Sequence, residues 1–283
     1  MSTNIHPTAI VHPDVKIGEH VTIEAYATIN SPHVVLEDGV TIKSHAHIEG
    51  HTTIGAETMI YPFACIGTTT QDLKYRGERT FVKIGKRCKL REYVTINSSC
   101  GEDTSVTIGD DCLIMACSHV AHNCIIGNHV IMSNAVLLAG HVIVEDYVTI
   151  AGMTGVHQFV RIGAHSMIGA MSRLMLDFPP YFIGGDNPIR LGGINLVGLK
   201  RRSFPLKTRV ELSKAFKILY RSDLDIDKAL DRIEKELEPL PEIQHLVRFC
   251  RQSRRGLAGF KNIANDEEGP NLSENENPLL KNA

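Results

Sequence analysis

Residues 105–174 read SVTIGDDCLIMACSHVAHNCIIGNHVIMSNAVLLAGHVIVEDYVTIAGMTGVHQFVRIGAHSMIGAMSRL. An aliphatic side chain recurs at every sixth position of this stretch, at Ile108, Ile114, Val120, Ile126, Met132, Leu138, Val144, Ile150, Val156, Ile162, Ile168 and Leu174. The same period runs through residues 5–29, 36–66 and 84–96. A period of six is typical of the hexapeptide parallel β-helix, in which short strands alternate with corners and each coil packs on the next. The sequence therefore predicts a β-class protein.

Small residues such as Ala9, Ala46, Ser118 and Thr154 occur two positions before the aliphatic one, and three of the seven cysteines fall there, at Cys88, Cys112 and Cys124. We interpret these three as small core residues. The cysteine count is odd and no CxxC pair occurs, which argues against a disulfide framework and against a thiolate zinc site. Glycine often follows the aliphatic residue, as at Gly109 and Gly127, where a tight corner would favour a residue without a side chain.

The pattern divides the chain into three parts. Residues 1–188 are predicted to form the β-helix, and segments 67–82 and 97–107 break the period, so we expect them to be inserted loops on the binding face. Residues 189–265 carry helical spacing and are predicted to form a small domain that caps the open sheet edges. The acidic segment 266–283 has no periodicity and is predicted to be a disordered tail.

Composition excludes several classes of function. A net charge of −2 and a pI near 6.7 give no bulk electrostatic reason to bind nucleic acid. The first seven residues have neither a basic start nor an apolar stretch, and no segment approaches the roughly 20 apolar residues of a membrane helix. We therefore expect a cytoplasmic protein with no membrane insertion.

The period also predicts which side chains meet. Three hexads make one triangular coil, so residues 18 apart should stack: His122, Gly140 and Gln158 in one column, and Asn123, His141 and Phe159 in the next. His119, His122 and His141 should all point out of the prism, and a solvent-accessible histidine can act as a general base near neutral pH. Gly140 would offer a backbone N–H for an oxyanion hole.

Six segments carry a resemblance to a known family. They are QDLKY (71–75), HVAHNC (119–124), LLAGH (137–141), GVHQF (155–159), FPPY (178–181) and GINLVGLKRR (193–202). In this order on a hexapeptide frame, over residues 3–257, they resemble the acyl-carrier-protein UDP-N-acetylglucosamine O-acyltransferases. The resemblance implies a left-handed winding and a homotrimer with active sites between subunits. It also implies transfer of a fatty acyl chain to the sugar 3-hydroxyl in the first step of lipid A synthesis, and this chain is expected to be a 3-hydroxyacyl chain.

The resemblance also implies residue roles. His122 would be the general base and Gly140 the oxyanion donor. Substrate contacts would come from Asp72, Lys74, His119, His141, Gln158, Asn195, Arg201 and Arg202, the last three at the nucleotide end, where arginine suits a diphosphate. No cofactor or metal is implied, because the phosphopantetheine thioester of acyl carrier protein is a co-substrate. Basic residues such as Arg161 and Arg173 are expected to meet this acidic partner.

Two positions depart from the family pattern. Asn123 stands where better-known members carry an aspartate beside the catalytic histidine, and a neutral amide can orient the imidazole but cannot stabilise an imidazolium by charge. Ala170 stands where members use glycine or a larger residue to set the floor of the acyl groove. Its methyl group is expected to shorten the preferred acyl chain slightly or to have no effect.

Three other kinds of protein share parts of this pattern. A gamma-class carbonic anhydrase has the same fold and binds zinc through three histidines, for which His119, His122 and His141 are candidates. That assignment leaves QDLKY, the KRR segment and the helical domain unexplained. A later N-acyltransferase of lipid A synthesis shares the repeats but usually has an extra N-terminal uridine-binding domain. A non-catalytic scaffold predicts that replacing His122 changes no activity.

Overall fold

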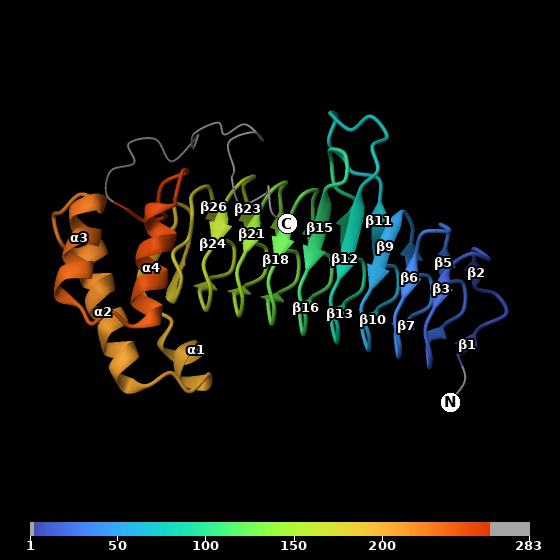
Figure 1. Ribbon diagram of the computed structural model, residues 1–283, viewed down its shortest axis with the longest axis horizontal. Helices are drawn as coiled ribbons and strands as arrows, with labels where there is room; N and C mark the ends of the chain where they lie inside the picture. The colour runs from blue at the N-terminus through green and yellow to red at the C-terminus, as the bar shows by residue number, and fades with distance from the viewer. Residues whose placement is uncertain (1–2, 261–283) are drawn as a thin grey trace.

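The computed structural model describes residues 3–260 as a triangular prism of short strands followed by four helices (Figure 1). Each coil contributes one strand to each of three sheets, which form the faces of the prism and in which strands of successive coils pair in parallel. The predicted tail 266–283, and the last five residues of the segment 189–265, lie outside the described residues.

The three faces are named sheets 1, 2 and 3. Sheet 1 contains β1 (Asn4–Ile5), β4 (Thr22–Ile23), β7 (Thr41–Ile42), β10 (Met59–Ile60), β13 (Lys89–Leu90), β16 (Leu113–Ile114), β19 (Ile131–Met132), β22 (Thr149–Ile150), β25 (Met167–Ile168), β27 (Phe182–Gly185) and β28 (Arg190–Ile194). Sheet 2 contains β2 (Ile10–Val11), β5 (Thr28–Ile29), β8 (His47–Ile48), β11 (Cys65–Thr68), β14 (Thr95–Asn97), β17 (His119–Val120), β20 (Leu137–Leu138), β23 (Gly155–Val156) and β26 (Arg173–Leu174). Sheet 3 contains β3 (Lys16–Ile17), β6 (Val35–Leu36), β9 (His51–Ile54), β12 (Phe81–Ile84), β15 (Ser105–Ile108), β18 (Ile125–Ile126), β21 (Ile143–Val144) and β24 (Arg161–Ile162).

The register confirms that residues 18 apart stack. Val120 in β17 pairs with Leu138 in β20, which pairs with Val156 in β23. These aliphatic side chains are at most 4% exposed, and Cys88, Cys112 and Cys124 are buried beside them.

Two corners of the prism are named by the residues at their turns. The site corner, between sheets 2 and 3, carries Asn123, His141 and Phe159, and the ladder corner, between sheets 3 and 1, carries His129, Tyr147, His165 and Tyr181.

The corner glycines have a different reason from the one predicted. Gly109 and Gly127 are not in the left-handed region, but a Cβ on Gly127 would lie 2.3 Å from Asp146 Oδ1 on the next coil. Glycine there permits close stacking of coils, whereas the left-handed backbone falls two residues later, on residues such as His129 (φ 55°). Asparagine and histidine tolerate this conformation better than most side chains do.

The inserted loops are shorter than predicted, because the ladders extend into both segments. β11 continues to Thr68 and β12 begins at Phe81, so the first loop spans 69–80, and the second loop spans 98–104, between β14 and β15. The two loops project side by side from the prism (Figure 1). Arg79 and Asp103 join them through an ion pair of 2.6 Å.

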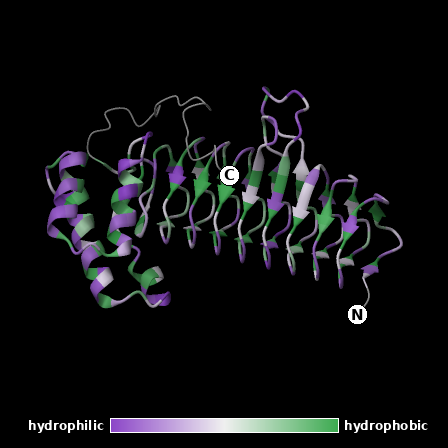
Figure 2. Ribbon diagram, viewed as in Figure 1, coloured by the Kyte–Doolittle hydropathy of each residue, from purple (hydrophilic) through white to green (hydrophobic). Residues whose placement is uncertain are grey.

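The C-terminal helices lie against the end of the prism that is farther from the N-terminus (Figure 1). They are α1 (Leu196–Arg201), α2 (Leu206–Arg221), α3 (Ile226–Glu236) and α4 (Pro241–Arg251). β27 and β28 form an antiparallel hairpin that extends sheet 1, so residues 190–194, which the sequence placed with the helices, belong to the sheet. Figure 2 shows hydrophobic and hydrophilic residues alternating around the helices, as expected for elements with one buried face.

The helices begin where local chemistry favours them. Asp225 caps α3 by accepting a hydrogen bond from the Lys228 N–H, and Pro241 occupies the first turn of α4. The short helix α1 was not predicted, and Asn195 caps it by accepting a hydrogen bond from the Gly198 N–H.

Within residues 3–260, no helix is both long and apolar enough to span a bilayer.

Candidate active site

His122 lies at the site corner and is held by its sequence neighbour. Its Nδ1 is 2.9 Å from Asn123 Oδ1. The orientation of the Asn123 amide is fixed by Cys100 in the second loop, since Asn123 Nδ2 donates to the Cys100 carbonyl and Oδ1 accepts from the Cys100 N–H. An amide oxygen only accepts, so Nδ1 of His122 carries the proton and Nε2 keeps a lone pair. The base-competent nitrogen is therefore Nε2.

Gly140 lies directly against the ring of His122, one coil further on. A Cβ on Gly140 would come within 2.3 Å of both Cε1 and Nε2 of the imidazole, so any side chain there would displace the ring. Within the part of the chain that the structure describes, no hydrogen bond uses the Gly140 N–H. The predicted adjacency of an imidazole and a glycine amide is present.

The first loop brings a carboxylate to the other side of the His122 ring. Asp72 Oδ2 is 3.5 Å from His122 Nε2, and the two side chains are only 17% and 15% exposed. Asp72 Oδ1 accepts a hydrogen bond from the Lys74 N–H, which fixes the turn, and the Lys74 side chain is exposed. His122 is thus flanked by side chains at both ring nitrogens.

The expectation of solvent-accessible histidines is wrong for His141, which is 4% exposed. The ring of His141 stacks on Phe159 with centroids 4.6 Å apart and meets the ring of His122 edge-on at 5.1 Å, so its neighbours exclude water. His119 is partly buried, and its Nδ1 is 2.7 Å from Thr95 Oγ1. Burial, and then the nearby His122, lower the pKa of His119. Gln158 lies in the His122 column, one coil beyond Gly140.

The three residues predicted for the nucleotide end do not join His122 within one chain. Asn195 caps α1 and its Nδ2 donates to the carbonyl of His165, at the ladder corner. The guanidinium of Arg202 lies 4.9 Å from the ring centroid of Tyr147, at the same corner, and Arg201 is exposed. The predicted site residues therefore form two groups on different corners of the prism.

An open groove of about 380 Å³ runs along the outer face of sheet 2 from His119 toward the helices. It is lined by His119, Leu137, Leu138, Ala139, Gly155, Val156, His157, Arg173 and Met175. Gly155 stands in a strand position where a Cβ would meet nothing within 4 Å, so its missing side chain leaves space in the groove. Ala170 is exposed at the turn between β25 and β26.

Arg161 does not face a partner as the sequence suggested. It is 8% exposed, its guanidinium lies 4.2 Å from the ring centroid of Phe249, and its backbone N–H donates to Asp177. The side chain is covered because α4 packs over β24, so Arg161 joins the helical domain to the prism. Arg173 remains exposed on β26.

Two residues that contact Asn123 and His119 were not identified from the sequence. Cys100 fixes Asn123, and Thr95 hydrogen-bonds to His119. Cys100 lies in a loop without periodicity, so no pattern marked it. Thr95 precedes an inward aliphatic residue, as His119 does, and lies one coil earlier. The second loop lies between them and separates the two residues by 24 positions, so the pairing could be identified only from the structure.

The histidines do not converge as a three-histidine zinc site requires. His119 is bonded to Thr95, while the rings of His122 and His141 meet edge-on rather than with nitrogens aimed at a common point. Among residues 3–260, no group of three or more histidine, cysteine, aspartate or glutamate side chains is arranged to hold a metal ion.

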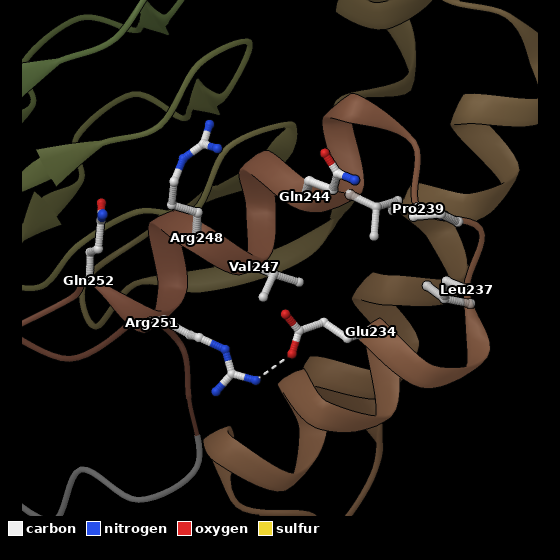
Figure 3. A pocket seen from close by; sticks show the side chains of 9 residues that line it. Glu234, Leu237, Pro239, Gln244, Val247, Arg248, Arg251 and Gln252 are labelled. Carbon is white, nitrogen blue, oxygen red and sulfur yellow. Dashed lines mark hydrogen bonds and ion pairs between the residues drawn. The ribbon is translucent and has the colours of Figure 1, made fainter.

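A second cavity, of about 520 Å³, lies in the helical domain between α3 and α4 (Figure 3). Leu237, Pro239 and Val247 line it, and Arg251 pairs with Glu234 beside it. It contains none of the site residues predicted from the sequence.

Two family models match the chain. One, described as the bacterial transferase hexapeptide with six repeats, matches residues 105–140, and the other, described as domain 2 of UDP N-acetylglucosamine O-acyltransferase, matches residues 177–258. Together with the prism and its cap of helices, they define the class as a hexapeptide-repeat transferase with a left-handed parallel β-helix, which confirms the predicted fold class.

Relatives identify the member of this class. The chain is 56% identical over 256 residues to the acyl-acyl-carrier-protein–UDP-N-acetylglucosamine O-acyltransferase of Chlamydia caviae, covering 90% of this chain and 91% of that one. It is 38% identical to the crystal structure of the UDP-N-acetylglucosamine acyltransferase from Bacteroides fragilis, with a TM-score of 0.87 over 89% of this chain and 99% of that one. The Francisella novicida acyltransferase gives 32% identity and 0.86 over 89% and 93%. The chain belongs to the acyl-acyl-carrier-protein–UDP-N-acetylglucosamine O-acyltransferase family.

Proposed function

We propose that this chain transfers a fatty acyl group, a 3-hydroxyacyl chain, from the thioester of acyl carrier protein to the 3-hydroxyl of UDP-N-acetylglucosamine, with His122 as the general base. The reaction is the first step of lipid A biosynthesis, and we place it in the cytoplasm. The observation that carries the mechanism is the contact of His122 with the bare backbone of Gly140, together with the hydrogen bond that leaves Nε2 unprotonated.

The geometry supports a complete proton path. Nε2 of His122 takes the proton of the sugar 3-hydroxyl while the oxygen attacks the thioester carbonyl carbon. The Gly140 N–H donates to the carbonyl oxygen as it becomes negative, which stabilises the tetrahedral intermediate. The C–S bond then breaks, and the imidazolium returns the proton to the departing thiolate of the phosphopantetheine arm.

The neighbouring polar side chains suit the two substrates. Asp72 approaches His122 from the first loop, and Lys74, two residues further on, is exposed; the two would hold the glucosamine hydroxyl and acetamido groups. Asp72 is close enough to Nε2 that the arriving 3-hydroxyl must take its place. His119 and Gln158 flank the base along the corner and would contact sugar and pantetheine. The buried His141 supports the ring of His122 edge-on.

The separation of the two groups of site residues supports a shared site. Asn195, Arg201 and Arg202 lie at the ladder corner, so a diphosphate attached to a sugar at His122 reaches them only on a neighbouring subunit. Exposed apolar side chains are available for such an interface: Leu73 on the first loop is 90% exposed, and Tyr93 and Met153 are more than half exposed. We therefore propose a homotrimer whose sites are completed by pairs of subunits.

The groove on sheet 2 suits the acyl chain. It begins at His119, beside the base, and its lining is mainly apolar. The space left at Gly155 admits a hydrocarbon chain, and the exposed Arg173 lies at the far end, near the helical domain. Arg173 and the helical domain would meet acidic acyl carrier protein, in place of the pair that included Arg161.

The test is His122→Ala, assayed with acyl carrier protein thioesters of mixed chain length and UDP-N-acetylglucosamine, with products identified by mass spectrometry. We expect the rate to fall by about 10² to 10⁴-fold, the usual contribution of a general base, with an unchanged melting temperature. His20→Ala serves as the matched control, because His20 is an exposed corner histidine far from the site. Near-normal turnover of His122→Ala would remove the base from the mechanism, and absence of acyl transfer by the unsubstituted protein would favour a scaffold.

A further inference from the structure

Asn123 makes three hydrogen bonds with two different segments. Its Oδ1 accepts from His122 Nδ1 at 2.9 Å and from the Cys100 N–H at 3.1 Å, while its Nδ2 donates to the Cys100 carbonyl at 3.0 Å. Asn123 is 7% exposed and Cys100 is 9% exposed, so water has little access to these bonds. The amide thus pairs with the backbone of the second loop as a neighbouring strand would, and orients the base at the same time.

Only an amide satisfies this set of partners. A carboxylate at the same position would accept from His122 and from the Cys100 N–H, but its second oxygen would face the Cys100 carbonyl oxygen with no proton between them. Two acceptors in contact in a buried site are costly, because each loses hydration without gaining a partner. The backbone conformation does not discriminate, since asparagine and aspartate both tolerate the φ of 58° found at this position.

We propose that Asn123 is a positioning residue that locks the second loop to the general base, and that this chain requires an amide rather than a carboxylate there. The inference rests on His122 being the base. The negative charge near the imidazole then comes from the opposite side, from Asp72 on the first loop, 3.5 Å from Nε2. Since Arg79 and Asp103 tie the two loops together, the two sides of the imidazole face one joined pair of loops.

The test uses Asn123→Asp, with Asn134→Asp as the control because Asn134 is an exposed corner residue outside the site. We expect kcat for Asn123→Asp at pH 8 to fall about 10²-fold, as for a misplaced catalytic group, with a smaller change in KM. Amide hydrogen exchange across residues 98–104 should become at least tenfold faster at pH 8. Asn134→Asp should change none of these values.

A pH series separates this role from general damage. A buried aspartic acid facing the Cys100 carbonyl would have its pKa raised above the unfolded value of about 3.9, because only the protonated form donates a hydrogen bond there. The melting temperature of Asn123→Asp should therefore approach that of the unsubstituted protein at pH 4 and fall below it as the pH rises. Asn123→Gly keeps the backbone conformation and removes the amide. It should lower the melting temperature, relative to the unsubstituted protein, by the same amount at pH 4 and at pH 8.

Two results would overturn the inference: unchanged loop exchange in Asn123→Asp at pH 8, or turnover equal to that of the unsubstituted protein. If Asn123→Asp is too unstable to purify at pH 8, its exchange is measured at pH 5 against Asn123→Gly. The exchange and melting results do not depend on catalysis. An active His122→Ala variant would therefore refute the proposed base while leaving the lock between Asn123 and Cys100 separately measurable.

Discussion

The site corner and the ladder corner are built by the same repeat, yet only the site corner places a histidine against a bare glycine backbone. At the ladder corner, the rings of His129, Tyr147, His165 and Tyr181 stack in succession, with centroids 4.5, 4.8 and 5.7 Å apart. At the site corner, the stack of Phe159 and His141 stops at Asn123, and the adjacent column places Gly140 against His122. The repeat favours stacked rings, and His122 contacts Gly140 where the stack lacks one ring and the neighbouring column lacks a side chain.

The largest effect should come from filling the space at Gly140. In Gly140→Ala the new methyl group would lie 2.3 Å from the ring of His122, so the imidazole must move, and a displacement near 1 Å costs about 10²-fold in rate. We expect kcat to fall by about that factor or more with the fold retained, measured by steady-state kinetics and circular dichroism. Gly192→Ala is the control, because its Cβ would meet only Ile183 O, at 3.8 Å. Unchanged kcat in Gly140→Ala would show that the contact does not hold the base.

The next prediction brings the two corners together across subunits. His122→Ala and the double variant Arg201→Ala/Arg202→Ala should each be nearly inactive alone. Co-expressed in equal amounts, they should regain about a quarter of the normal activity, because a site shared by two subunits is intact only when an intact histidine meets an intact arginine pair, one neighbour pair in four. Activity of the whole co-expressed population, parental trimers included, checks this, with separately assembled parents mixed as the control. No recovery in mixed trimers would mean that both groups act within one chain.

Much of the fold followed from the sequence because the period is a local property with a global consequence. A strict six-residue spacing fixes which side chains point inward, and stacking of coils then fixes neighbours 18 residues apart, as the pairing of Val120 with Leu138 shows. The adjacency of His122 and Gly140 followed from the same rule. The helices α2, α3 and α4 were predicted from apolar spacing and from Pro241.

The features that could not be predicted depend on segments outside the six-residue repeat or on contacts between coils. The second loop raises the offset between Thr95 and His119 to 24 residues, and no pattern specified that Cys100 would reach Asn123. The burial of His141 arises from the ring of Phe159, one coil further on, and not from its own position in the repeat, which exposed corner residues also occupy. Helix α1, six residues long, is too short for periodicity to mark.

The smallest predicted effect tests whether the ladder corner is purely structural. Burial, and then the nearby Arg202, lower the pKa of His165 to about 4, so the native state binds a proton less tightly than the unfolded chain does. Stability should therefore fall as the pH drops from about 6.5 to about 4, by on the order of 1–2 kcal/mol because the ring is partly exposed. His165→Phe keeps the stacked ring without a titrating group and should lose less stability over this range, measured by urea unfolding at pH 7 and pH 4.

His129→Phe provides the matched control for that comparison, since His129 stands at the exposed end of the same stack with 42% of its side chain accessible. Its acid sensitivity should equal that of the unsubstituted protein. If His165→Phe instead shows the full loss of stability between pH 7 and pH 4, protonation elsewhere destabilises the fold. Protonation of the histidine at the ladder corner would then not destabilise the fold. The proposed difference, a ladder corner that must stay neutral and a site corner that accepts a proton, would be refuted.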